Sequence, residues 1–185
     1  MINHAKTHSI KPLPSWTLIM WLSALSLLTC ACQRTEDIPV NGVDCHAQSL
    51  WSDTRPAINL KHIFCGEINK RGKPVGFHAR PGGKNPSTAE VIAIKSGPNA
   101  AGVYTAEVAV IAEDGTKKLK FSTLYPDRFS VSQTIAAILN AYKNAAPGQT
   151  KWRGPSGQGF DIEGYVLEQG AHQGDINTAY PIYVE

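Results

Sequence analysis

Two histidines, His62 and His78, lie sixteen residues apart in a stretch that is dense in cationic side chains. An imidazole has an ordinary pKa near ~6.5, so two of them can hold opposite protonation states near neutral pH, one as a base and one as an acid. The flanking cations favour an anionic reacting group. They are Lys70, Arg71, Lys73, Arg80 and Lys84. A surface loop with two ordinary histidines would have the same spacing, so both interpretations stay open at this point.

The positive charge of the chain is concentrated in this stretch. The chain has 18 Lys and Arg against 15 Asp and Glu, and two of its lysines precede residue 32. Residues 55–84 contain seven cationic residues and one acid, Glu67. This distribution indicates a basic face on a protein that is otherwise close to neutral. Glu67 is either a partner that orients His62 or a charge at the start of a turn.

The first 31 residues have the pattern of an export signal. Two lysines precede an apolar run over 16–28, which ends in Thr29-Cys30-Ala31-Cys32 without a charged stop. Such a short, interrupted run favours a cleaved signal peptide over a permanent membrane span. Cleavage after Ala31 would expose Cys32 for acylation, as in a bacterial lipoprotein, whereas ordinary signal peptidase would release a soluble protein. We expect an exported protein, either a periplasmic or outer-membrane lipoprotein anchored to the membrane at Cys32, or a secreted one.

The other two cysteines of the mature chain are expected to form a disulfide bond. Acylation of Cys32 would leave Cys45 and Cys65 as an even pair in an oxidising compartment. Closing a loop of this size would contribute on the order of ~3 kcal/mol. The alternative is a zinc site, although the spacing matches no standard zinc motif. Its ligands would come from Cys45, His46, His62, Cys65 and His78.

The chain divides into the signal (1–31), a polar tether (32–55) and a folded domain (56–185). Ser130 with Gln133 forms a capping-box pattern that predicts one helix over 131–144. A Gly/Pro-rich loop is expected over 147–159. Segments rich in apolar or β-branched residues predict strands over 91–94, 103–112, 117–123, 160–167 and 177–184, the second and third forming a hairpin. This order predicts an α+β domain of antiparallel sheets with few helices.

The strand expected over 117–123 alternates in polarity. Leu119 and Phe121 fall on one face, which we expect to pack in the core. The other face, expected on the surface opposite the core, carries Lys118, Lys120 and Ser122.

Four separated motifs resemble the bacterial EndoU nuclease family. They are KHIFCGEI at 61–68, GFH at 76–78, KKLKFST followed by YPDRFS within 117–130, and NTAYPIY at 177–183. The resemblance covers residues 56–184 and implies an EndoU-like fold related to that of RNase A. It also implies cleavage of single-stranded RNA, typically 3′ of uridylates. In that reaction the ribose 2′-OH attacks the adjacent phosphorus and leaves a 2′,3′-cyclic phosphate and a free 5′-OH, with no cofactor or metal.

The resemblance assigns roles to individual residues. His62 and His78 become the catalytic pair, and we favour His78 as base and His62 as acid, a choice the sequence does not decide. The cation that offsets the charge on the phosphorane falls at Lys118, with Lys120 on the same face as the alternative. The expected substrate contacts are Ser122, Thr178 and Tyr180.

The resemblance also suggests partners. Domains of this family often serve as toxins in competition between bacteria, which would add an immunity protein to the RNA substrate. The alternatives are a lipid-anchored binding module on an inactive EndoU scaffold and the Cys/His zinc protein. The presence of both histidines, a lysine and the Thr-x-Tyr triplet together favours an active enzyme.

Overall fold

The computed structural model describes residues 42–185. The predicted signal peptide, its cleavage site and the lipid anchor at Cys32 lie outside the described residues. Within residues 42–185, no helix is long and apolar enough to cross a membrane.

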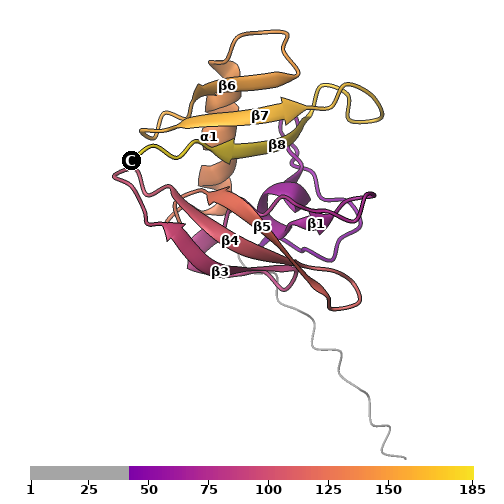
Figure 1. The fold of residues 1–185 in the computed structure, drawn as a ribbon. Coiled ribbons are helices and arrows are strands. Elements are labelled where there is room, and N and C mark those ends of the chain that lie inside the picture. The colour runs from indigo at the N-terminus through magenta and orange to yellow at the C-terminus, as the bar shows by residue number, and fades with distance from the viewer. Residues whose placement is uncertain (1–41) are drawn as a thin grey trace, which may run out of the picture. The chain divides into compact units, whose positions relative to one another are not determined.

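Three antiparallel sheets and one α-helix make up the described domain (Figure 1). The strands are β1 (Glu67–Ile68), β2 (Pro74–Val75), β3 (Ala89–Ser96), β4 (Tyr104–Ile111), β5 (Lys117–Leu124), β6 (Lys151–Pro155), β7 (Asp161–Val166) and β8 (Ile176–Pro181). The helices are α1 (Val131–Lys143) and two short turns, η2 (Lys61–Cys65) and η3 (Pro81–Gly83). The predicted α+β class, with antiparallel sheets and few helices, is confirmed.

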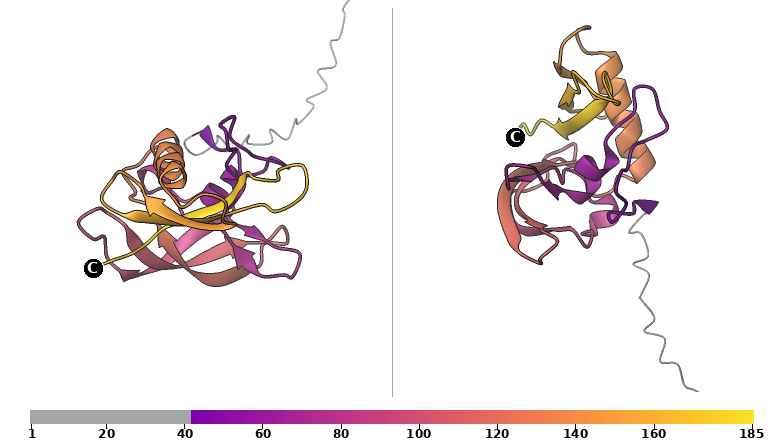
Figure 2. Two further views of the ribbon diagram at one scale, coloured as in Figure 1. Left: turned by 90° about the horizontal axis from the view of Figure 1, so that it is seen from above. Right: turned by 90° about the vertical axis from the view of Figure 1, so that its right-hand side faces the viewer.

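Helix α1 lies along one face of the β6–β7–β8 sheet (Figures 1 and 2). The helix begins at the predicted capping box, in which Ser130 and Gln133 each bond the other's backbone. Strand β6 falls within the region expected to be a loop, so that prediction is wrong. Its glycine is required by packing, because a Cβ at Gly154 would lie 2.1 Å from the carbonyl oxygen of Ala141 in α1. A glycine that permits close approach was thus mistaken for a loop signal.

The β3–β4–β5 sheet shows the predicted alternation with its two faces exchanged. Leu119 and Phe121 are 55% and 63% exposed, whereas Ser122 is buried and both lysines of the polar row are half-buried. The polar face turns inward because it meets the β1–β2 region, whose backbone carbonyls accept hydrogen bonds from Lys118 and Lys120. The expectation that the apolar face packs in the core is therefore wrong.

The segment before residue 56 contributes to the packed domain. Val43 and Cys45 are buried in the main core cluster, and Cys45 forms a disulfide bond with Cys65. The described part of the expected tether therefore packs on the domain, which begins earlier in the chain than residue 56.

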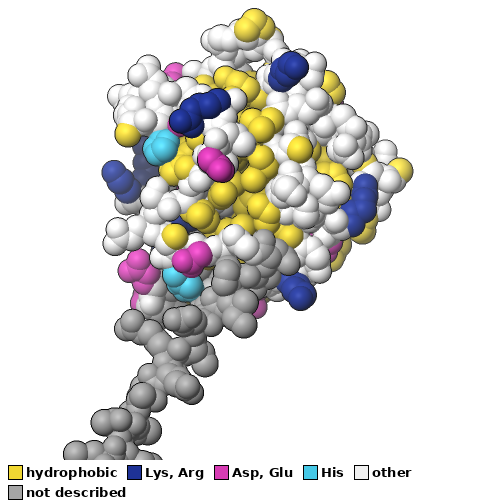
Figure 3. Space-filling model, turned by 180° about the vertical axis from the view of Figure 1, so that it is seen from behind, with side chains coloured by type: hydrophobic (Ala, Val, Ile, Leu, Met, Phe, Trp, Pro, Cys, Tyr) yellow, Lys and Arg dark blue, Asp and Glu magenta, His cyan; other side chains and the backbone are white. Residues whose placement is uncertain are grey.

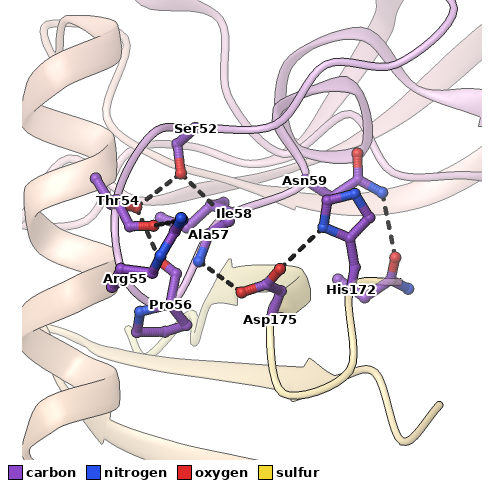
Figure 4. Close-up of polar contacts among 10 residues, drawn as sticks. Ser52, Thr54, Arg55, Pro56, Ala57, Ile58, Asn59, His172 and Asp175 are labelled. Carbon is purple, nitrogen blue, oxygen red and sulfur yellow. Dashed lines mark hydrogen bonds and ion pairs between the residues drawn. The ribbon is translucent and has the colours of Figure 1, made fainter. Parts of the chain in front are cut away.

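Residues 51–59 are fastened to the loop before β8 (Figure 4). Asp175 accepts a hydrogen bond from the backbone N–H of Ala57 at 2.8 Å and contacts His172 Nδ1 at 2.9 Å. The ring of His172 stacks on Trp51 with 3.8 Å between centroids. These contacts fix β8 relative to η2, which begins just after this segment.

Candidate active site

His62 lies in η2, a single π-helical turn. Its backbone N–H donates to Asn59 Oδ1 at 3.1 Å, and Asn59 Nδ2 donates to Asn177 Oδ1 in β8 at 3.1 Å. The imidazole Nδ1 lies 3.1 Å from Glu67 Oε1. The hydrogen bond from His62 lowers the pKa of Glu67. The charged carboxylate then favours a proton on Nδ1 and fixes the ring, so Glu67 has the orienting role rather than that of a turn charge.

The two histidines are brought together by a close backbone approach. A Cβ at Gly76 would lie 2.3 Å from the carbonyl oxygen of His62, and Gly76 has a φ of 74°, so this position requires glycine. Phe77 follows with a φ of 59°, unusual for a residue with a side chain. Its backbone N–H donates to the His62 carbonyl oxygen at 2.8 Å, and its ring is fully buried. This packing compensates the unfavourable backbone and sets His78 beside His62.

His78 is held as a neutral imidazole. It is 9% exposed, and its Nδ1 lies 3.1 Å from the carbonyl oxygen of Thr123. Because a carbonyl oxygen can only accept, Nδ1 carries the proton and Nε2 holds the lone pair. Burial lowers the pKa of His78 well below 6.5, and the nearby charges of Lys120 and His62 lower it further. His78 can therefore act as a base near pH 7.

The two imidazoles lie side by side with opposite surroundings. Their ring centroids are 5.9 Å apart. His62 contacts a carboxylate, whereas His78 is buried against a carbonyl oxygen and near a lysine. Such a difference in environment can separate the roles of two like groups, and burial favours the neutral form of His78.

Of the two candidate lysines, Lys120 lies closer to the histidines. Its Nζ donates to the carbonyl oxygen of Gly76 at 2.8 Å. Burial lowers the pKa of Lys120 to about 8, and its charge lowers the pKa of His78. Lys118 Nζ instead donates to the carbonyl oxygen of Gly72, an exposed residue of the β1–β2 turn, at 2.9 Å. The geometry favours Lys120, the alternative of the two, and the choice between Lys118 and Lys120 stays a prediction.

Ser122 lies behind His78. It is 2% exposed, its Oγ donates to the carbonyl oxygen of Phe77 at 2.7 Å, and the same Oγ lies 3.1 Å from His78 Nδ1. A hydroxyl in this position can orient the imidazole. Because it is buried, a nucleobase has little access to it. These contacts favour a role for Ser122 in positioning His78, and its expected contact with the substrate stays a prediction.

Strand β8 brings Thr178 and Tyr180 to the same site. The ring of Tyr180 lies 5.4 Å from that of His78. Its hydroxyl donates to Glu163 Oε1, and Glu163 also pairs with Lys151 at 3.0 Å. Thr178 is half-buried, and within residues 42–185 its hydroxyl makes no hydrogen bond. Thr178 can thus offer a free hydroxyl and Tyr180 a ring held in place through Glu163.

Glu163 and the motif Tyr125–Ser130 support the site in ways that sequence reasoning missed. Asp127 Oδ2 binds Arg80 at 2.7 Å, and Asp127 Oδ1 accepts the hydroxyl proton of Tyr104 at 2.7 Å. The loop that follows His78 is thereby tied to β4. Arg80 is consequently a structural cation, which the charge pattern of the sequence alone could not distinguish from its neighbours.

The disulfide also bears on the zinc alternative. Both sulfur atoms of Cys45 and Cys65 are joined to each other, so neither is a thiolate available to a metal. Within the described residues, no three His, Cys, Asp or Glu side chains are grouped so that they could hold a metal ion.

The turn η2 and the segment after β2 thus bring two imidazoles to the place where β5 contributes a lysine and β8 a tyrosine, as acid–base chemistry on an anion requires. Residues 57–183 match the family of bacterial EndoU nucleases, and the chain belongs to this family. It is also similar to a protein named Toxin from Bacillus cereus (strain ATCC 14579), at 33% identity over 129 residues. The alignment covers 66% of this chain and 22% of that relative, so the chain spans about a fifth of the relative's length. No solved structure matches the chain.

Proposed function

We propose that this protein cleaves single-stranded RNA 3′ of uridylates by transphosphorylation. The observation that carries the proposal is the state of His78, which is buried and neutral with its lone pair on Nε2. A base of this kind can remove the proton of a ribose 2′-OH. The 2′ oxygen then attacks the adjacent phosphorus.

The leaving group requires a proton from the opposite side of the reaction. As the bond between phosphorus and the 5′ oxygen breaks, His62 donates a proton to that oxygen, and Glu67 orients its imidazole through Nδ1. Lys120 offsets the extra negative charge of the phosphorane. The products are a 2′,3′-cyclic phosphate and a 5′-OH, and every proton is accounted for by side chains of this chain.

Selection of uridine rests on β8 in this proposal. The ring of Tyr180 provides a stacking surface for an unpaired base, and the free hydroxyl of Thr178 can donate to or accept from a base edge. The hydroxyl of Thr178 and the ring of Tyr180 together suit a small pyrimidine base beside the two histidines.

The domain from residue 32 onward, incubated in EDTA with an oligonucleotide containing one uridine, should give a cyclic-phosphate end and a 5′-OH end. Replacing the uridine 2′-OH by hydrogen should prevent cleavage at that step. Intact RNA, or cleavage that gives 5′-phosphate ends, would contradict the proposal. His62→Ala and His78→Ala variants that fold but do not cut serve as controls against contaminating ribonuclease.

A role as a toxin is the physiological setting that the name of the similar Bacillus cereus protein supports. An immunity protein would then be a second partner beside RNA. The N-terminal pattern supports export, with lipid attachment at Cys32 or release by ordinary cleavage. Mass spectrometry of the mature N-terminus in a bacterial host would distinguish an acylated Cys32 from a free one.

A further inference from the structure

The β1–β2 hairpin projects a positively charged turn from the two-histidine site. Its strands pair antiparallel, with Glu67 opposite Val75. Glu67 at the start of β1 contacts His62, and β2 leads directly through Gly76 to His78. The turn between the strands, residues 69–73, is therefore connected at each end to one of the two histidines.

The turn has a defined conformation. Asn69 Oδ1 accepts the backbone N–H groups of Arg71 at 2.9 Å and Lys73 at 3.1 Å, which is a side-chain cap on a tight turn. Lys118 Nζ adds a bond from β5 to the carbonyl oxygen of Gly72 at 2.9 Å. These contacts hold the turn while its cationic side chains remain exposed.

The cations of this turn differ from many others in the protein. The side chains of Lys70, Arg71 and Lys73 are exposed, and within the part of the chain that the structure describes none of them forms an ion pair. Five other cations meet carboxylates, in the pairs Lys95–Glu107, Lys117–Glu90, Lys151–Glu163, Arg153–Asp161 and Arg80–Asp127. On the rear face, Lys and Arg side chains lie around an apolar central area (Figure 3).

We infer that the β1–β2 hairpin binds backbone phosphates of the RNA outside the cleaved step. The inference rests on the proposed function and names the part of the substrate that this turn contacts. Three exposed cations with no carboxylate partner suit phosphodiester groups. Because they lie on a turn with no aromatic ring or amide aimed at a base, the contact adds affinity without reading sequence. Lys118 links the β1–β2 hairpin to β5 through its bond to Gly72.

The test compares a long and a short substrate. The variant carries Lys70→Gln, Arg71→Gln and Lys73→Gln, and the control carries Lys95→Gln, Lys117→Gln and Lys143→Gln, three exposed lysines on other elements. The substrates are a twelve-nucleotide RNA with one uridine and the dinucleotide UpA, which has no phosphate beyond the cleaved one.

The hairpin variant should lose about tenfold or more in kcat/KM on the long RNA at 0.15 M salt and nothing on UpA. Its dependence of log kcat/KM on log salt should become shallower by about 2, since each single-strand phosphate contact contributes ~0.7 to the slope. The control variant should keep the wild-type ratio between the two substrates.

Each other result overturns the inference. Unchanged cleavage of the long RNA would show that the hairpin does not contact it. An equal loss on both substrates would make the turn a support of the histidines. Failure of the wild-type protein to cut either substrate would instead refute the proposed function itself, so the two failures are distinguishable.

Discussion

The two lysines of β5 provide the sharpest test of the site, because they share one strand, one face and one kind of partner. Lys118 and Lys120 both donate to a backbone carbonyl oxygen of the β1–β2 region, at 2.9 and 2.8 Å. They differ in burial and in their effect on His78. Replacing either lysine by Gln removes one positive charge from the same strand. Any difference between the two variants therefore reflects the position of the lysine and not the net charge.

Lys120→Gln is expected to reduce kcat/KM on a uridine oligonucleotide by about 10²–10³-fold. Loss of one preorganised group that stabilises a developing oxyanion costs roughly 3–4 kcal/mol of transition-state stabilisation. Lys118→Gln should reduce the rate on UpA by less than about threefold, since Lys118 bonds the turn at Gly72 and its charge is partly screened by solvent. Lys120→Arg should restore part of the activity, because the charge returns with a different shape.

A second measurement does not depend on catalysis. The charge of Lys120 lowers the pKa of His78, so an NMR titration should show that pKa rising in Lys120→Gln and unchanged in Lys118→Gln. Thermal unfolding of both variants checks that the sheet is intact. Equal losses of activity in the two variants, or an unmoved His78 pKa in Lys120→Gln, would refute the assignment of Lys120.

Three further predictions concern His78, Glu163 and the disulfide. Because the pKa of His78 is lowered in the folded protein, the base stays neutral as the pH falls through 6.5. The acid limb of kcat/KM should therefore lie below pH 6.5, and a limb at or above that value would contradict the assignment. Glu163→Ala releases the hydroxyl of Tyr180 and should raise KM about 3–10-fold more than it lowers kcat. Asp161→Asn, which breaks the Arg153 pair on the same sheet, should leave KM unchanged, and an equal KM shift there would point to net charge instead. Cys45 and Cys65 are 20 residues apart in the sequence, and reducing their disulfide should lower the free energy of unfolding in urea by about 3 kcal/mol. A urea midpoint that does not change with reductant would contradict this prediction.

Local signals predicted the regular elements well. The capping box set the start of α1 at residue 131, and the alternating segments around Asp114-Gly115 became the paired β4 and β5. Strands β1 and β2 have two residues each, too short to show a period. Strand β6 was missed because its glycine, required by the contact with α1, looks like a turn residue in the sequence.

The candidate site was predicted as a set of residues but not as an arrangement. The family motifs named both histidines, the lysine pair and the Thr-x-Tyr triplet. Alternation in β5 could not show which face is covered, because that depends on the β1–β2 region packing against it. The same contact places Ser122 Oγ against His78 Nδ1, and Lys120 Nζ against the carbonyl oxygen of Gly76. Glu163 carries no local signal, since its role arises only from pairing opposite Tyr180 across two strands.

The electrostatics of the site depend on two features of the fold, the burial of His78 and the lack of a carboxylate beside Lys120 in the described residues. Lys120 is half-buried without a carboxylate partner in the described chain, and this burial lowers its pKa to about 8. The neutral state of His78 depends partly on that positive charge, so the free protein keeps a cation and a base together by desolvating both. A bound phosphodiester supplies the missing anion. It should therefore raise the pKa of Lys120 and of His78, and a substrate that strengthens the cation also makes the base a better proton acceptor. On the proposed mechanism, the site should thus become more reactive when occupied, because the substrate itself completes the charge balance.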